Sequence, residues 1–224
     1  MMMSLFSMFD PSANFSLQTN WMFMILSILL LPPLYWCKKS RINNVVTMIL
    51  NVLSKEFSSL FSNNILMRGS ILISMSLFLF IMFNNLTSNF PYTFCCSAHM
   101  VFSISLSVPI WLSIIIFYWT NLTKTMLSHL VPMGTPPVLM PLMVMIELTS
   151  NIIRPLALSV RLSANLIAGH LLMALLGNTL NLDGFIWPLV VLLQTGFMFF
   201  ELMVAIIQSY VFSVLMTLYS SEIS

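Results

Sequence analysis

VLMPLMVMIELTSNIIRPLALSVRLSANLIAGHLLMALLG, residues 138–177, is the stretch of sequence that decides the fold. It contains no cluster of turn-forming residues, and Pro155 is the only proline in its interior. As one α-helix it would be about 60 Å long, about twice the 30 Å hydrocarbon thickness of a bilayer. Because a straight helix of that length needs a tilt beyond the usual range, we expect a helix that is strongly inclined, kinked or split at Pro155.

The whole chain shares the apolar character of this stretch. Of its 224 residues, 59% are hydrophobic and 6% are charged, whereas about 25% of the residues of a soluble domain are charged. This composition excludes a water-soluble fold. The net charge of +2 also excludes nucleic-acid binding through a basic surface. The chain is therefore predicted to lie in lipid.

Further apolar segments of membrane-spanning length lie on both sides of this stretch. Residues 42–61 place Lys55 and Glu56 among apolar side chains, a pattern typical of an amphipathic helix on the membrane surface. The prediction is one all-α, polytopic membrane domain, 1–224, with five membrane helices and one surface helix. The predicted membrane helices are 17–36, 69–86, 98–119, 138–177 and 185–218, the last two long and strongly inclined, and the predicted loops include NNLTSNFPY (84–92) and 120–137.

The basic residues predict the orientation of these segments. Six of the eight bases fall on one side of the membrane in this arrangement, whereas Asp10 and Asp183 fall on the other. By the positive-inside rule, the N-terminus is outside and the C-terminus is inside. The six bases are Lys38, Lys39, Arg41, Lys55, Arg68 and Lys124.

Four charged residues remain within the membrane segments. At 100° per residue, five polar residues of 138–177 share one face along about 27 Å of helix, and three more form a second polar face. The first face holds Glu147, Asn151, Arg154, Arg161 and Asn165, the second holds Ser159, Ser163 and His170, and Gln194, Glu201 and Gln208 follow at intervals of seven in 185–218.

A charge inside the hydrocarbon is costly, by about 2.5–3.5 kcal/mol on insertion scales. A purely structural hydrogen-bond network between helices is one interpretation of these residues. For Arg161 and Glu201 a functional role is favoured, because cheaper residues would serve for packing. The cysteines and histidines fit no metal-ligand spacing, and no phosphate-binding loop or nucleophile motif is present. We therefore expect no metal, no cofactor and no catalytic chemistry of the chain's own.

SVRLSANLIAGH, residues 159–170, resembles the signature of subunit a of the rotary, proton-translocating ATP synthases in its mitochondrially encoded form. The resemblance is specific over 130–222, whereas over 1–130 it rests on the order and kind of segments. Supporting matches are Gly134, Thr135 and Pro136, Glu147, Glu201, Ala205, Ile207 and Gln208, and Tyr210, Val211 and Phe212.

This resemblance implies a stator subunit beside a ring of rotor subunits that carry membrane carboxylates, together with other stator subunits. Arg161 would be the essential cation that makes an arriving rotor acid release its proton and that blocks leakage between two offset proton paths. His170 and Glu201 would belong to the path from the intermembrane space and Glu147 to the path toward the matrix. Asn165 and Gln208 would tune Arg161. Arg154, Asn151, Gln194 and Ser163 are secondary candidates.

The same resemblance implies the mitochondrial inner membrane, with the N-terminus toward the intermembrane space and the C-terminus toward the matrix. Reflection of the last two helices about residue 181 or 182 predicts Glu201 at the level of Arg161 and Gln208 about two turns away, whereas the family pattern places Gln208 beside Arg161. Two alternative functions are a secondary ion transporter, for which the inverted repeats typical of such folds are not found, and a structural subunit of a respiratory membrane complex.

Overall fold

A computed structural model of the whole chain describes residues 8–11, 19–29, 40–60, 69–90, 93–131, 136–178 and 187–222. In these ranges the regular structure is entirely helical, which confirms the all-α prediction. The α-helices are α1 (Met22–Leu29), α2 (Arg41–Leu60), α3 (Ser70–Ser88), α4 (Met100–Asn121), α5 (Thr123–His129), α6 (Met140–Asn178) and α7 (Trp187–Glu222), and two short 3-10 helices are η3 (Thr19–Trp21) and η5 (Cys96–Ala98).

Four of these helices are long and apolar enough to cross a membrane. They are α3, α4, α6 and α7, and each begins within two residues of the first residue of a predicted span. The multi-pass prediction is therefore confirmed for them. The first predicted span, 17–36, is described only through η3 and α1, because residues 30–36 lie outside the described ranges.

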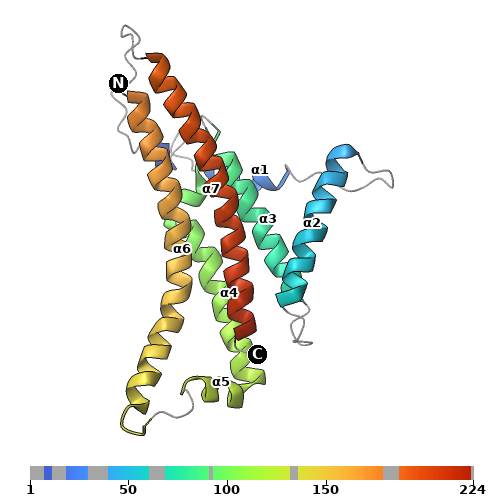
Figure 1. Ribbon diagram of the computed structural model, residues 1–224, viewed down its shortest axis with the longest axis vertical. Helices are drawn as coiled ribbons and strands as arrows, with labels where there is room; N and C mark the ends of the chain where they lie inside the picture. Colours follow the sequence, from blue (N-terminus) through green and yellow to red (C-terminus); the bar gives the residue numbers. More distant parts are fainter. Residues whose placement is uncertain are drawn as a thin grey trace.

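Helix α6 is continuous for 39 residues, so the chain does not split at Pro155. Figure 1 shows α6 bowed, with its two halves leaning in different directions. Pro155 lies inside the helix and is buried. A proline removes one backbone hydrogen bond and crowds the preceding turn, which is a known cause of bending in long helices.

Close packing of α3 and α7 depends on small hydroxyl side chains. Ser209, Ser213 and Thr217 recur every four residues along α7 and are almost fully buried, as is Ser74 of α3. Each hydroxyl donates to a carbonyl oxygen three residues earlier in its own helix. Since lipid supplies no hydrophobic drive between helices, small self-satisfied side chains let two backbones approach closely.

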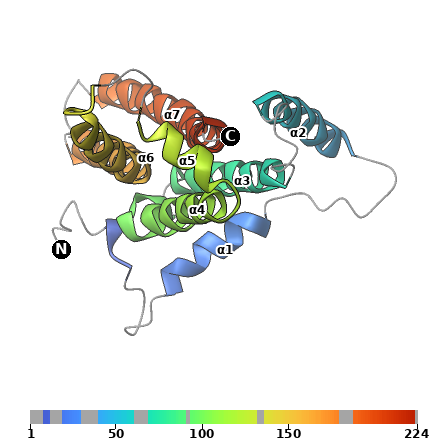
Figure 2. The ribbon, with the colours of Figure 1, turned by 90° about the horizontal axis from the view of Figure 1, so that it is seen from below.

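The apolar core lies between α3, α4, α6 and α7. Figure 2 shows α3 and α4 between α1 on one side and the pair of α6 and α7 on the other. The core holds Ile81 of α3, Leu158, Leu162 and Leu166 of α6, and Phe212 and Met216 of α7.

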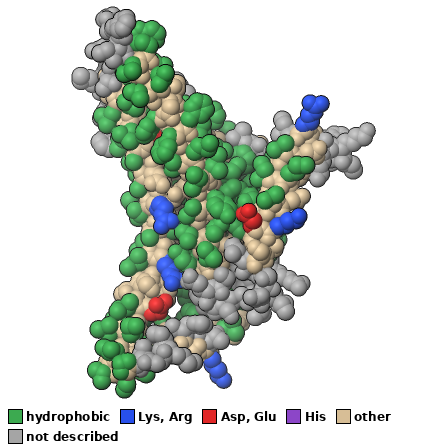
Figure 3. Space-filling view, viewed as in Figure 1, with side chains coloured by type: hydrophobic (Ala, Val, Ile, Leu, Met, Phe, Trp, Pro, Cys, Tyr) green, Lys and Arg blue, Asp and Glu red, His purple; other side chains and the backbone are tan. Residues whose placement is uncertain are grey.

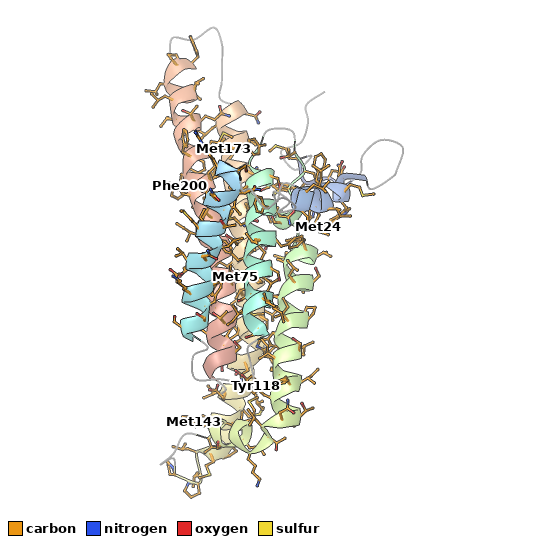
Figure 4. All side chains as sticks on the ribbon, turned by 90° about the vertical axis from the view of Figure 1, so that its right-hand side faces the viewer. Met24, Met75, Tyr118, Met143, Met173 and Phe200 are labelled. Atoms are coloured by element: carbon orange, nitrogen blue, oxygen red, sulfur yellow. The ribbon has the colours of Figure 1, made fainter. Side chains whose placement is uncertain are left out.

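Helix α2 packs along α3 through Leu53 and Phe57, which contact Phe78 and Met75. In Figure 4, α2 runs beside α3 whereas α1 lies across their direction. The sequence predicts the helix and its bounds to within one residue. A position on the membrane surface stays a prediction.

Two predicted loops contain helix. Residues 120–137 include α5, because breakers begin only at Pro132 and none interrupts Thr123–His129. Leu122, at φ −133° and ψ 44°, separates α5 from α4. Asn84 and Asn85, predicted as part of a turn, lie inside α3 and are buried.

Candidate functional site

The two polar faces predicted on α6 have different surroundings. Ser159 and Ser163 are fully buried, and each follows a buried core leucine, Leu158 or Leu162. Arg161, in contrast, is exposed on the surface of the chain. Figure 3 shows basic and acidic side chains lying over α6 in a surface that is otherwise mostly hydrophobic or uncharged. The Arg161 side chain is therefore accessible to a protein that packs on this face of α6.

Small residues surround Arg161 on its exposed side. Ala157, Ala164 and Ala168 are exposed, and at 100° per residue they lie within about 60° of Arg161 around the helix. Ser163 belongs to the inward face, where its hydroxyl donates to the carbonyl oxygens of Ser159 and Val160 at 3.4 and 3.2 Å. The structure therefore does not bring Ser163 to Arg161.

One hydrogen bond sets the register between α6 and α7. Asn165 Nδ2 donates to Gln208 Oε1 at 3.1 Å, one turn along α6 from Arg161. The simple reflection that predicts Gln208 two turns away from Arg161 is therefore wrong. Figure 1 shows α7 beginning beyond the end of α6, so residues equally far from the turn do not face each other.

Glu201 lies beside Gly169, about 12 Å along α6 from Arg161. The prediction that Glu201 is at the level of Arg161 is wrong for the same reason. An ideal Cβ on residue 169 would be 1.8 Å from Glu201 Oε1. Only glycine allows the carboxylate to approach the α6 backbone this closely.

His170 follows Gly169 and points to the N-terminal segment. Its ring makes an edge-to-face contact with Phe9, with 6.3 Å between the ring centroids. His170 Nε2 and Glu201 Oε1 are buried without a hydrogen-bond partner. The structure thus brings His170 and Glu201, predicted from distant parts of the sequence, to neighbouring positions.

A small pocket is lined by Glu201 and by the Asn165–Gln208 pair. It is also lined by Asn85 of α3, and its volume is about 20 Å³. That is room for about one water molecule. Asn85 Nδ2 donates to the Ala205 carbonyl oxygen at 3.5 Å, whereas Asn85 Oδ1 has no partner. Sequence reasoning missed Asn85, because the composition of NNLTSNFPY indicates only a turn.

The remaining candidates lie farther apart. The Arg154 guanidinium lies 4.9 Å from the ring centroid of Tyr219, a cation–π contact that links α6 to the end of α7. Glu147 and Asn151 are half-buried on the lower half of α6, and Gln194 is half-buried near the start of α7. Within the described ranges no three His, Cys, Asp or Glu residues form a cluster that fits a metal ion.

The chain matches known proteins along its whole length. Residues 17–221 match the family model described as ATP synthase A chain. The chain is 49% identical over 225 residues to ATP synthase subunit a of Drosophila mauritiana and 48% identical over 227 residues to ATP synthase subunit a of Aedes aegypti. Each alignment covers 100% of both chains.

Proposed function

Because the chain belongs to the ATP synthase subunit a family, we propose that it is the stator proton-channel subunit in which Arg161 separates two offset proton paths. Membership of the family makes it a multi-pass component of the membrane sector of ATP synthase that works with other subunits of the complex. The observation that carries the proposal is an exposed arginine at the middle of a membrane-length helix.

The exposed side of α6 around Arg161 is the proposed contact with a ring of rotor subunits. Arginine keeps its proton at any relevant pH, so it is a permanent cation there. A permanent cation stabilises the ionised form of a nearby carboxylate, so a protonated rotor acid that arrives at Arg161 gives up its proton. Ala157, Ala164 and Ala168 allow a rotor helix to come close enough for this interaction.

The outer path is proposed to end at Glu201, His170 and the pocket with Asn85. Support comes from the unpartnered Glu201 Oε1, His170 Nε2 and Asn85 Oδ1, because buried polar atoms of this kind need water or a proton partner. The Asn165–Gln208 pair then stands between this path and Arg161. Its amide groups conduct no proton of their own and orient the residues around the arginine.

The inner path is proposed to begin near Glu147. The face that holds Glu147, Asn151 and Arg154 continues from Arg161 toward the other end of α6. Protons released beside Arg161 would leave along this face. The positive charge of Arg161 repels protons, which prevents direct leakage from the outer path.

The proposed location is the mitochondrial inner membrane, with the N-terminus toward the intermembrane space and the C-terminus toward the matrix. We further propose that the chain has no catalytic chemistry of its own. ATP is then made by other subunits of the complex, and this subunit converts the inflow and outflow of protons into rotation of the ring.

Replacement of Arg161 tests the proposal. In the assembled complex, Arg161→Ala is expected to abolish proton-driven ATP synthesis, because rotor acids are no longer ionised beside the stator. ATP synthesis is measured after an acid pulse on the outer side, per amount of assembled complex. Lys55→Ala is the matched control, because it removes an exposed base on α2. Normal synthesis by a stably assembled Arg161→Ala complex would overturn the proposal.

A further inference from the structure

Within the described residues, the buried polar atoms without a hydrogen-bond partner gather at one place. They belong to the end of α3, to η5 with the residue that follows it, and to the facing turns of α6 and α7. They are Asn85 Oδ1, Asn89 Nδ2 and Oδ1, Ser97 Oγ, His99 Nε2, His170 Nε2 and Glu201 Oε1. Buried polar groups of native proteins almost always have a partner, and water supplies it where protein atoms do not.

Independent contacts connect these atoms to one another. Asn85 and Glu201 line the same pocket. The Cys95 thiol interacts with the side chains of Ser88 and Ser97 and is close enough to Glu201 to feel its charge. Asn85, Ser97 and Glu201 are thus parts of one region that extends from the loop between α3 and α4 to Glu201.

His99 lies at the loop end of this region, in an aromatic cluster. Its ring centroid is 5.4 Å from that of Trp21 and 5.2 Å from that of Phe94. One ring N–H donates to the backbone carbonyl of Phe9. Nε2, the other ring atom that can exchange a proton, is buried and has no partner.

Phe9 connects the two histidines of the region. Its backbone carbonyl accepts a hydrogen bond from the His99 ring, and its own ring contacts the His170 ring edge-to-face. A hydrogen bond to one ring nitrogen fixes the tautomer, so Nε2 of a neutral His99 is the acceptor. The N-terminal segment therefore engages one ring nitrogen of His99 and leaves Nε2 as the buried nitrogen without a partner.

We propose that His99 is a further proton-transferring residue, at the mouth of the outer path. Nε2 takes a proton from water on the outer side and passes it to water that leads to His170 and Glu201. Only N–H and O–H bonds form and break, and the ring returns to its neutral form. This inference rests on the proposed function of the chain.

The other titratable groups near His99 do not replace it. Burial lowers the pKa of the His99 imidazole, which favours the neutral, proton-accepting ring. Burial raises the pKa of Cys95, and it raises that of Cys96 to about 11, so both thiols stay protonated near neutral pH. Asp10, next to Phe9, is exposed, and His170 and Glu201 lie farther along the path.

His99→Phe separates proton transfer from packing. Phenylalanine keeps an aromatic ring against Trp21 and Phe94 but carries no ring nitrogen. We expect ATP synthesis driven by an outer acid pulse to fall on the order of 100-fold, the low end of what a positioned proton-transferring side chain contributes. His99→Gln, which keeps a donor for the Phe9 carbonyl, is expected to be slow as well. Trp21→Phe is the matched control and is expected to be normal.

Two results would overturn the inference. One is synthesis by assembled His99→Phe within about twofold of the unaltered complex, with the same dependence on outer pH. If Arg161→Ala abolishes synthesis in the same assay, only the role of His99 fails, whereas normal synthesis by Arg161→Ala removes the proposed function itself.

The unaltered complex provides the second result. Deuterium exchange at the ring carbon between the two nitrogens of His99, measured by mass spectrometry, is expected to follow the pH of the outer medium. Absence of such exchange, as in a dry core histidine, would overturn the inference even if the variants failed to assemble.

Discussion

Gly169 is a single residue whose missing side chain determines where a carboxylate lies. Gly169→Ala would place a methyl group 1.8 Å from Glu201 Oε1, so the carboxylate must move away from α6. We expect proton-driven ATP synthesis to fall about tenfold or more, because a misplaced proton-transferring group loses much of its contribution. Glu201→Gln, which keeps the shape of the side chain and removes its proton exchange, is expected to have a similar effect.

Two other glycines provide the controls for this prediction. A methyl group added at Gly177 on α6 or at Gly196 on α7 would have no atoms within 4 Å outside its own stretch of helix. Gly177→Ala and Gly196→Ala are therefore expected to leave synthesis unchanged and to favour the helix by up to about 1 kcal/mol each. Equal rates for Gly169→Ala and these two variants would show that the position of the carboxylate does not matter.

Between elements, the hydrogen bond from the Tyr118 hydroxyl to the Ser220 carbonyl oxygen joins the lower ends of α4 and α7. Tyr118 is 1% exposed, and Figure 4 places it near the C-terminal end of α4. Tyr118→Phe leaves a buried carbonyl with one partner fewer, at a cost of about 1 kcal/mol. We expect a lower midpoint of thermal unfolding for the complex in detergent.

Tyr210→Phe is the matched change on a less buried tyrosine. Tyr210 is 39% exposed and donates to Glu56 Oε2 at 3.3 Å. An exposed bond of this length contributes little, so the midpoint is expected to move less than with Tyr118→Phe. A larger decrease in the unfolding midpoint for Tyr210→Phe than for Tyr118→Phe would mean that the contact with α2 stabilises α7 more than the contact with α4 does.

At the level of elements, sequence predicts what depends on local pattern. The long apolar runs predict α3, α4, α6 and α7 to within two residues at their N-terminal ends and four at their C-terminal ends, because length and hydropathy alone define a membrane helix. The register of α6 against α7 was not predictable, since it depends on how far the two helices are offset along their axes. The hydrogen bond from Asn165 to Gln208 shows the actual register, which reflection about the turn predicts incorrectly.

The candidate site follows the same division. Arg161 and Glu201 were recognisable because an intramembrane charge is costly wherever it points. Asn85 and His99 were not, because an asparagine or histidine near a loop looks the same in sequence whether it faces solvent or a buried pocket. Their importance is visible only from the atoms left unpartnered around them.

For the whole molecule, the orientation in the membrane is testable from the two ends of the bundle. Thr123 begins α5 and Asn178 ends α6, and both are exposed. Figure 1 shows α5 and the C-terminal end of α6 at opposite ends of the bundle. With the N-terminus outside, Asn178→Cys is expected to react with a membrane-impermeant maleimide added from the outer side, and Thr123→Cys only from the inner side. Cys37→Ser is made in both variants and in their control, and the remaining cysteines, Cys95 and Cys96, are buried. The opposite labelling pattern would reverse the two proton paths.

The outward position of Arg161 has a consequence for how the chain is made. Only 6% of the most apolar window of α7 is buried within the chain, and Arg161 on α6 is exposed. A newly inserted copy would hold that arginine against lipid at a cost of about 2.5–3.5 kcal/mol until another protein covers it. We therefore expect synthesis of the chain to be matched to the supply of the protein that covers Arg161. Copies that lack this protein are expected to be degraded rapidly by membrane proteases.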